Sequence, residues 1–359
     1  MYRYSNGQIS LADFKQPVGM NLKESNRWVK KAQTIPWPEI EKRYAALFTN
    51  RKGNVAKPLR LALGACIIQA EYGFSDEETA HMIQENPYLQ YFCGYPGYDD
   101  EKLPFDPSLM VYFRKRLTPE VLGEINEMIV RDAKERQGKE AKSKDDDDDS
   151  DGQPGTGGNS GTNRTHSVPD RIVSVSQPFV RPIVRGKAGK PVEFGAKLDI
   201  SVVDGWTQLE CCSFDAHNEA GNLREMAERF RAREVHYPSR ILADKIYRNR
   251  ENLSYCKAHG IRLSGPALGR PKKGETRDKA QDYRDECERV EVERRFTLAK
   301  RKCGMGLVTA KLRETAAHVI AMSVLVLNLR KIQRALLRML AYLLEILAQN
   351  KNWALVQWT

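Results

Sequence analysis

A low-complexity stretch at residues 137–167 divides the chain into two parts with different hydrophobic patterns. It begins rich in lysine, passes through Asp145–Asp149 and ends in glycine, serine and asparagine at Gly152–Gly161. Such a composition buries too little apolar surface to offset the conformational entropy that folding removes. We therefore predict a flexible linker. The aspartate run is interpreted as a solvated charge run, with cation binding as the alternative.

The part before the linker, residues 1–136, has helical spacing. Apolar residues recur every three or four positions through Val55–Tyr72, which predicts a helix with one buried stripe. Ser75 and Glu78 have the spacing of a capping box, so a second helix is expected to begin there. A basic stretch at Pro107–Leu117 and a helix over 118–136 complete an all-helical unit.

Helix, tight turn, helix and basic helix is the order typical of a helix-turn-helix DNA reader. The basic residues that would contact DNA are Arg114, Lys115 and Arg116. An ordinary helical bundle with a solvated basic face fits the same periodicity, and the sequence pattern alone leaves both readings open.

The part after the linker alternates strand and helix patterns. The expected strands are Arg171–Ser176, Val192–Val203, Trp206–Phe214, Arg240–Asp244 and Ile261–Ser264. The expected helices cover about 220–233, 250–259, 278–302 and 315–348. Asp204-Gly205 predicts a tight hairpin between two of the strands. This order predicts a mixed α/β sheet with helices on its faces over residues 168–335, followed by a C-terminal helix and tail over 336–359.

The charge balance indicates a polyanionic partner. The chain of 359 residues has a formal net charge of +11, and 29% of its residues are charged. Each phosphate contact by a lysine or arginine releases counterions, which favours binding to nucleic acid. A protein that is basic only for solubility is the alternative.

Cysteine usage and the lack of an export pattern indicate a cytoplasmic protein. The 7 cysteines are scattered, with no C-x-x-C pair, so reduced thiols fit best. The N-terminal decapeptide has no apolar core of a signal peptide. The longest apolar run, Ala316–Leu329, is too short to span a bilayer. No membrane association is expected.

Two acidic positions are placed where catalytic sites occur. Asp244 ends a short apolar strand, and α/β sheets bind ligands at the carboxyl ends of their strands. Arg289, Glu293 and Lys300 fall on one helix face at spacings of four and seven residues. An amphipathic helix with surface salt bridges is the alternative reading of the second pattern.

These motifs resemble the signature of the DDE insertion-sequence transposases, which have an RNase H-like fold. The resemblance rests on Ala-Asp-x-x-Tyr at 243–247 and Arg-x-x-x-Glu-x-x-x-x-x-x-Lys at 289–300. More closely, the chain is similar to the IS-five superfamily, eleven-eighty-two-like group, over about 50–135 and 165–335. The segments that carry this are Glu85–Phe92, Phe105–Leu109, Asp170–Ser174, Val184–Ala188, Glu193–Lys197 and Leu263–Pro266.

The resemblance implies a bacterial transposase that binds the double-stranded DNA of its terminal inverted repeats, as a homo-oligomer. It implies strand cleavage and transfer with Mg²⁺ or Mn²⁺, in which three carboxylates hold two metal ions roughly 4 Å apart. Asp244 and Glu293 match the second and third acids and are the expected catalytic metal ligands. Arg289 and Lys300 match the family's DNA-contacting cations. The loop residues Arg270, Lys272 and Lys273 are further candidate backbone contacts, or else a solvated loop.

The first acid of the family pattern is missing. The strand that carries it should follow the linker, yet Gly161 runs almost directly into Thr165. We interpret this as an internal deletion of the first strand of the RNase H-like domain. Asp170, Asp199 and Asp215 occupy other positions of the pattern and are not expected to replace it. The expectation is a transposase fold in damaged form with little activity. The rivals are a catalytically inactive DNA-binding remnant or regulator of transposition, and a structure-specific nuclease.

The C-terminal region is dense in leucine, alanine and valine. Its first half, from Thr315, is expected to cover the sheet. Its second half carries a leucine stripe over 336–347, which predicts core packing or, as the alternative, self-association.

Overall fold

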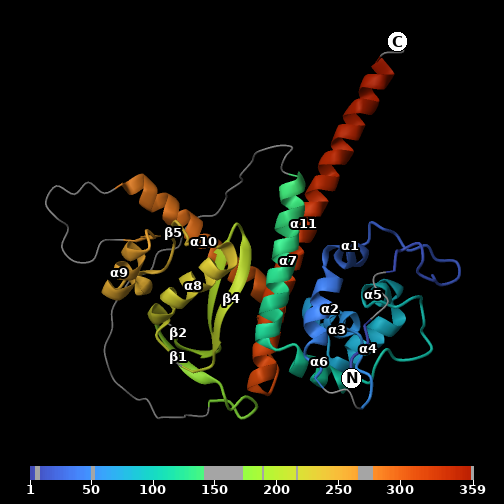
Figure 1. The fold of residues 1–359 in the computed structure, drawn as a ribbon, viewed down its shortest axis with the longest axis horizontal. Coiled ribbons are helices and arrows are strands. Elements are labelled where there is room, and N and C mark those ends of the chain that lie inside the picture. Colours follow the sequence, from blue (N-terminus) through green and yellow to red (C-terminus); the bar gives the residue numbers. More distant parts are fainter. Residues whose placement is uncertain are drawn as a thin grey trace. The chain divides into compact units, whose positions relative to one another are not determined.

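The chain has an α+β fold, with helices in its N-terminal region and small sheets in its C-terminal part (Figure 1). The computed structural model describes residues 1–4, 9–49, 53–140, 173–187, 190–215, 217–265 and 278–356. The described chain separates into two compact units. Unit 1 contains Met1–Ser150, Ala299–Thr309 and Glu314–Thr359, and unit 2 contains Asp151–Leu298 and Ala310–Arg313. The α+β class predicted from the sequence is confirmed at this level.

Unit 1 begins with a bundle of helices. They are α1 (Arg27–Thr34), α2 (Trp37–Ala45), α3 (Leu59–Tyr72), α4 (Asp76–Glu85), α5 (Pro87–Phe92), α6 (Leu109–Arg116) and α7 (Pro119–Glu140). The first ten residues of α3 are all buried, so α3 is the centre of the bundle. It begins four residues later than predicted because Pro58 disfavours helical geometry in the residue before it. Helix α7 continues through Glu140, four residues into the predicted linker.

The start of α4 confirms the predicted capping box. The Ser75 hydroxyl accepts a hydrogen bond from the Glu78 backbone N–H at 3.2 Å, and the Glu78 carboxylate accepts one from the Ser75 N–H at 2.7 Å. Gly73 ends α3 in the left-handed region, with its N–H donating to the Gln69 carbonyl at 2.8 Å. The tight turn between α3 and α4 is therefore fixed by local sequence.

Unit 1 also contains α11 (Arg313–Val356) from Glu314 onward, and this helix lies alongside α7 (Figure 1). The Asn328 amide donates to the Asn126 side-chain oxygen at 2.8 Å, and His318 Nδ1 lies 2.6 Å from the Leu117 carbonyl. The first half of this helix was expected to cover the sheet, and the structure gives it these contacts in the helical unit. Periodicity specifies which face of a helix is buried, but a helical bundle can cover the same apolar stripe.

Helix α11 is long and apolar enough, by length and composition, to cross a membrane. The qualifying window lies within Arg313–Met339 and has a mean hydropathy of 1.3, yet 72% of it is buried inside the protein. This burial is that of a core helix. Further along, Leu337 and Met339 are exposed, so these two members of the leucine stripe do not pack in a core.

The described part of unit 2 contains three separate two-stranded sheets, where one mixed sheet was expected. The antiparallel pairs are β1 (Arg181–Lys187) with β2 (Lys190–Gly195), and β3 (Lys197–Val203) with β4 (Trp206–Ser213); β5 (Arg240–Ile241) and β6 (Arg262–Leu263) are parallel. The predicted strand Val192–Val203 is broken because Gly195 adopts a φ of 142°. Of the predicted strand at 171–176, residues 173–176 form no strand, and Val175 is fully exposed.

The hairpin of β3 and β4 confirms the predicted turn. Asp204 and Gly205 both have positive φ, at 51° and 67°, as the right-handed twist of a two-residue hairpin requires. The pairing changes register between Asp199, which faces Cys211, and Ile200, which faces Leu209. A bulge therefore accommodates one extra residue, Glu210, on β4.

Helices surround the parallel pair β5–β6. They are η1 (Glu219–Asn222), α8 (Leu223–Glu234), η2 (Lys245–Tyr247), α9 (Arg250–Ala258) and α10 (Lys279–Lys302). A small apolar core joins α8 and α9 to β6, and its members are Leu223, Ala227, Tyr255, Cys256, Ile261 and Leu263. This core fixes the end of β5, from which the first candidate catalytic acid emerges.

Candidate functional site

Asp244 lies just beyond the parallel pair, at the start of η2. Strand β5 ends at Ile241, whereas the predicted strand extended to Asp244. Two hydrogen bonds with Ser264 hold the chain where it leaves β5. The Ser264 N–H donates to the Ile241 carbonyl at 2.9 Å, and its hydroxyl accepts from the Ala243 N–H at 3.2 Å. Asp244 caps η2 by accepting from the Lys245 N–H at 2.6 Å, and its side chain is exposed. The carboxylate is accessible to solvent at the carboxyl end of a strand.

Glu293 lies on α10 with its partners at the predicted spacing. The Arg289 guanidinium is 3.6 Å from the Glu293 carboxylate, one helical turn away. The Glu293 side chain is 67% exposed, so this ion pair contributes little to stability and leaves the carboxylate available. Lys300 is also exposed on the same helix. The Arg289–Glu293 ion pair agrees with both the family signature and the alternative of an amphipathic helix with surface salt bridges.

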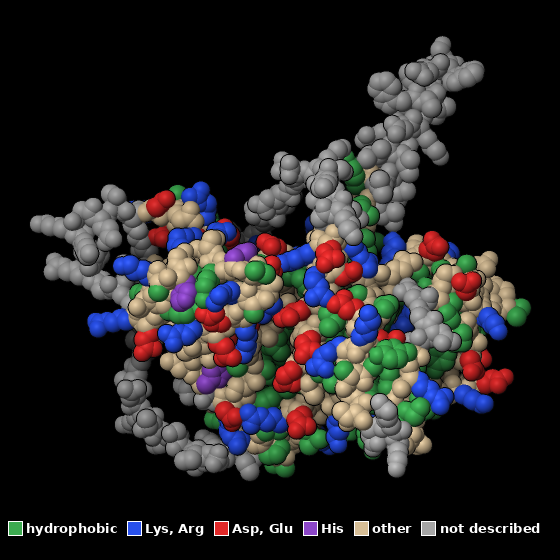
Figure 2. All heavy atoms as spheres, in the orientation of Figure 1, with side chains coloured by type: hydrophobic (Ala, Val, Ile, Leu, Met, Phe, Trp, Pro, Cys, Tyr) green, Lys and Arg blue, Asp and Glu red, His purple; other side chains and the backbone are tan. Residues whose placement is uncertain are grey.

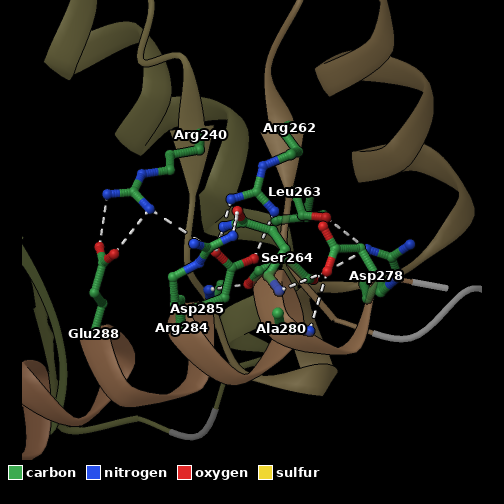
Figure 3. A network of polar contacts seen from close by, with 12 residues as sticks. Arg240, Arg262, Leu263, Ser264, Asp278, Ala280, Arg284, Asp285 and Glu288 are labelled. Carbon is green, nitrogen blue, oxygen red and sulfur yellow. Dashed lines mark hydrogen bonds and ion pairs between the residues drawn. The ribbon is translucent and has the colours of Figure 1, made fainter.

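An ion-pair network that was not predicted from the sequence connects α10 to β5 and β6 (Figure 3). Arg240 and Arg262 stand opposite each other in the parallel register, and both guanidinium groups reach acids of α10. Asp285 accepts two bonds from Arg262, at 2.5 and 2.7 Å, and Glu288 accepts two from Arg240, at 3.0 and 2.6 Å. This set of four residues is called the α10 clamp below.

The α10 clamp has one buried member. The Asp285 side chain is 5% exposed, and the hydrogen bonds from Arg262 hold the pKa of its carboxyl below the usual range. Glu293 is eight residues further along α10, roughly 12 Å along the helix axis. The clamp thus sets the position of the helix that carries Glu293 relative to the strand that precedes Asp244. The only sequence signal for it was two arginines and two acids in neighbouring elements.

Tyr247, the tyrosine of the Ala-Asp-x-x-Tyr motif, points toward the β3–β4 hairpin. Its hydroxyl lies 3.4 Å from the Asp199 carboxylate, and burial raises the pKa of Tyr247 above its usual value. Asp199 is buried and also accepts a bond from the Asn222 side chain at 2.5 Å. The motif therefore ties η2 to β3 through Asp199, one of the acids not expected to be catalytic.

The described residues do not complete a three-carboxylate metal site around Asp244 and Glu293. Within the described ranges, one group of three potential ligands has all its ligand atoms within 4.8 Å, namely Asp199, Cys211 and His217. Neither Asp244 nor Glu293 belongs to it. A two-metal centre needs ligands that reach both ions from several sides, and Asp244 with Glu293 would supply only part of such a set.

The candidate DNA-binding cations have different environments. Arg114 forms two bonds of 2.7 Å with Asp76, and its side chain is 13% exposed, so it joins α6 to α4. The Arg116 guanidinium lies 5.0 Å from the Phe48 ring centroid, whereas Lys115 is exposed. The loop candidates Arg270, Lys272 and Lys273 lie outside the described residues.

Charges of both signs are interspersed on the face drawn in Figure 2, without one large basic patch. The described lysines and arginines of this face are therefore mixed with acidic residues and do not form one stripe.

Comparison with known proteins gives two matches to transposase families and one to a curated protein. Residues 18–116 match a transposase domain family (DUF772), and residues 241–330 match the transposase DDE domain family. A segment of 131 residues, 36% of this chain, is 31% identical to the uncharacterized protein ORF8 in the nfe locus of Rhizobium meliloti. The match spans 61% of that protein's length. No solved structure matches.

The two family matches fall on the two regions that the sequence reading assigned to a transposase. The first covers the helices up to α6, and the second begins at the end of β5 and includes Asp244, Glu293 and Lys300. These matches, in this order along one chain, support a bacterial transposase.

Proposed function

We propose that the chain is the transposase of a bacterial insertion sequence. Residues 1–136 bind DNA at the ends of the element, and residues 168–335 form an RNase H-like DDE domain of the IS-five superfamily, eleven-eighty-two-like group. The observation that carries the proposal is the order of the two transposase matches, with Asp244 and Glu293 inside the second. The net charge of +11 supports DNA as the partner.

The DNA ligand is the double-stranded terminal inverted repeat, bound by a homo-oligomer in the cytoplasm. Among the candidate DNA-binding cations that the structure describes, Lys115 and Lys300 are exposed and accessible to phosphates. Arg289 contributes in the same way while it orients Glu293. Arg114 acts through its pair with Asp76, which holds the basic helix α6 against α4. The neighbouring Lys115 therefore stands on a rigid element.

The DDE family match implies a divalent metal, which we propose to be Mg²⁺ or Mn²⁺ bound by Asp244 and Glu293. Carboxylate oxygens are the ligands that these hard cations prefer. Both side chains are exposed, which allows an ion to approach, but the described residues supply no third carboxylate near them. The expected consequence is weak metal binding and slow DNA cleavage.

An internal deletion between about Gly161 and Thr165 accounts for the missing acid. In this proposal the first strand of the RNase H-like sheet is lost together with its aspartate. The three small sheets within the described part of unit 2 agree with such a loss, because a missing central strand leaves its neighbours without a common partner.

The second candidate function is a catalytically inactive DNA-binding remnant that regulates transposition. The observation that favours it is the geometry of the acids, since neither Asp244 nor Glu293 belongs to a group of three close ligands among the described residues. Such a protein would occupy the terminal repeats and compete with an intact transposase.

The test uses the purified full chain and DNA fragments that carry the inverted repeats flanking its gene. Gel-shift titrations compare these fragments with scrambled fragments of equal length, and a parallel assay follows strand cleavage with Mg²⁺. We expect preferential binding of the repeats, with affinity that falls as salt rises. Equal affinity for both fragments would contradict the proposed recognition of the element ends.

The variant Asp244→Ala separates the two candidate functions. Binding is expected to be unchanged, because the alanine removes an exposed carboxylate and leaves the helical unit intact. Slow wild-type cleavage that Asp244→Ala abolishes supports a weakened transposase. The absence of cleavage in both proteins supports the regulator.

A further inference from the structure

A second group of metal-binding side chains lies on the β3–β4 hairpin and the segment that follows it. Asp199 is on β3, Cys211 is on β4 and His217 comes after β4. One ligand atom from each, a carboxylate oxygen, a thiol sulfur and an imidazole nitrogen, lies within 4.8 Å of the other two. None of the three carries a role in the proposed transposase chemistry.

The hairpin register brings the first two ligands together. Asp199 and Cys211 are paired directly across the strands, so their side chains lie on the same face of the hairpin. The bulge at Glu210 lies immediately next to this pair and shifts the register of the ladder there. The Lys197 ammonium donates to the His217 backbone carbonyl, which holds the histidine beside the same face. The backbone therefore fixes the positions of all three ligand residues.

The His217 imidazole has an unsatisfied nitrogen that faces this group. Its Nε2 atom is buried and has no hydrogen-bond partner among the described residues. The nearest anion, Asp199 Oδ2, lies 3.7 Å away, too far for a hydrogen bond. Two donors on one tetrahedral Zn²⁺ ion are separated by roughly 3.4 Å. The observed separation is thus close to that of two ligands that share a cation.

The surrounding contacts are those of metal ligands. His217 Nδ1 lies 3.4 Å from the Asp215 backbone carbonyl, which favours the tautomer that leaves Nε2 free to coordinate. The Asn222 amide donates to Asp199 Oδ2 at 2.5 Å and orients the carboxylate, whose side chain is 2% exposed. Metal-binding histidines and carboxylates in proteins typically have such outer contacts.

The donor set selects the kind of metal. A thiolate, an imidazole and a carboxylate suit Zn²⁺ or Co²⁺, whereas Mg²⁺ requires oxygen ligands. A cysteine binds a metal ion as the thiolate and not as the thiol. Cation binding therefore displaces one proton from Cys211 to solvent and forms one sulfur–metal bond.

We propose that Asp199, Cys211 and His217 form a Zn²⁺-binding site that is separate from Asp244 and Glu293. Three protein ligands leave a fourth tetrahedral position for water. The ion links the segment after β4 to the hairpin. Through the contact between Asp199 and Tyr247, it also stabilises η2. The site does not depend on the proposed transposase function.

Cobalt titration of the purified full chain tests the site, because a cysteine thiolate bound to Co²⁺ gives a charge-transfer band in the near ultraviolet. We expect a band that saturates at about one ion per chain and that Zn²⁺ abolishes by displacement. Cys211→Ser should remove the band, and His217→Gln should weaken Co²⁺ binding by roughly tenfold or more. The matched control Cys287→Ser removes an exposed cysteine elsewhere and should leave the band unchanged.

Alkylation of the wild-type chain gives a second measurement that does not require a folded variant. Zn²⁺ should protect Cys211 from iodoacetamide, as measured by peptide mass spectrometry, and should leave Cys287 reactive. A band that persists in Cys211→Ser, or equal alkylation of Cys211 with and without Zn²⁺, would overturn the proposal. Those results would leave a contact between His217 and Asp199 in which Cys211 takes no part. Asp244→Ala should retain the cobalt band, which separates this site from the catalytic acids.

Discussion

Lys31 and Glu71 form a buried ion pair in the helical unit. Their side chains are 0% and 4% exposed, and the Lys31 ammonium lies 4.2 Å from the Trp28 ring centroid. Burial lowers the pKa of Lys31, and the attraction of Glu71 opposes that effect. The charged form of Lys31 therefore depends on the presence of Glu71.

Removing one partner of this pair should be costly. We expect Lys31→Met to lower the free energy of unfolding by about 3 kcal/mol, because Glu71 loses its closest cation and keeps the more distant Arg330, at 3.5 Å. The double variant Lys31→Met, Glu71→Leu should recover much of that loss. Urea denaturation at pH 7 measures both. A single variant as stable as the wild type would contradict the burial of the pair.

His318 should make unit 1 sensitive to acid. Burial lowers the pKa of His318 to about 4, and its Nδ1–H donates to the Leu117 carbonyl at 2.6 Å. In the unfolded chain its pKa is about 6.5, so between these values the unfolded state binds the additional proton. Stability is therefore fully present above pH ~6.5 and falls by up to about 3 kcal/mol as pH drops to ~4.

The variant His318→Asn tests this linkage, because its amide can donate to the same carbonyl but does not titrate. Denaturation midpoints measured from pH 7 to pH 4 should fall less steeply for the variant than for the wild type. Parallel pH profiles for the variant and the wild type would show that the pKa of His318 does not differ between the folded and unfolded states.

At the scale of secondary-structure elements, the α10 clamp contains a matched pair of acids. Asp285 is buried against Arg262, whereas Glu288 pairs with Arg240 at an exposed position. Asp285→Asn should lower the free energy of unfolding by about 2 kcal/mol through the loss of charged hydrogen bonds. Glu288→Gln should cost less than about 1 kcal/mol. Hydrogen exchange at the start of α10 should increase only in the first variant, and equal effects would contradict the clamp.

The elements that could be predicted from the sequence are those that neighbouring residues specify. Ser75 with Glu78 fixes the start of α4, and Asp204 with Gly205 fixes the hairpin, because each acts within four residues. The pairing of Arg262 with Asp285 spans 23 positions and has no periodic pattern. The same limit applies to the proposed zinc site, whose three ligands belong to three different segments.

At the scale of the whole molecule, the partners of long helices were the hardest to predict. The apolar stripe of α11 indicated burial correctly, but the bond between Asn328 and Asn126 places it in the helical unit. The positions of Asp244 and Glu293 on accessible surfaces agree with the family resemblance. Joint action of the two acids requires the first strand of the RNase H-like domain, which we interpret as deleted. Local sequence patterns carry no information about that strand.

Contact with DNA by the helical unit predicts a specific salt dependence. Lys115→Ala should weaken binding of element-end and unrelated DNA alike and reduce the slope of log affinity against log salt by about 0.9. The control Lys102→Ala removes another exposed lysine of unit 1 and should leave the slope unchanged. Gel-shift titrations at four salt concentrations measure both. Equal slopes for wild type and Lys115→Ala would show that Lys115 does not contact a DNA phosphate.

We propose that this chain binds its element ends as a transposase but cuts them poorly. The most direct measurement is a single assay that records binding and Mg²⁺- or Mn²⁺-dependent cleavage of the same labelled inverted-repeat fragment. We expect a clear shift of the fragment with little or no cleavage, and any residual cleavage should disappear in Glu293→Gln. Efficient metal-dependent cutting, or no binding of the fragment, would contradict it.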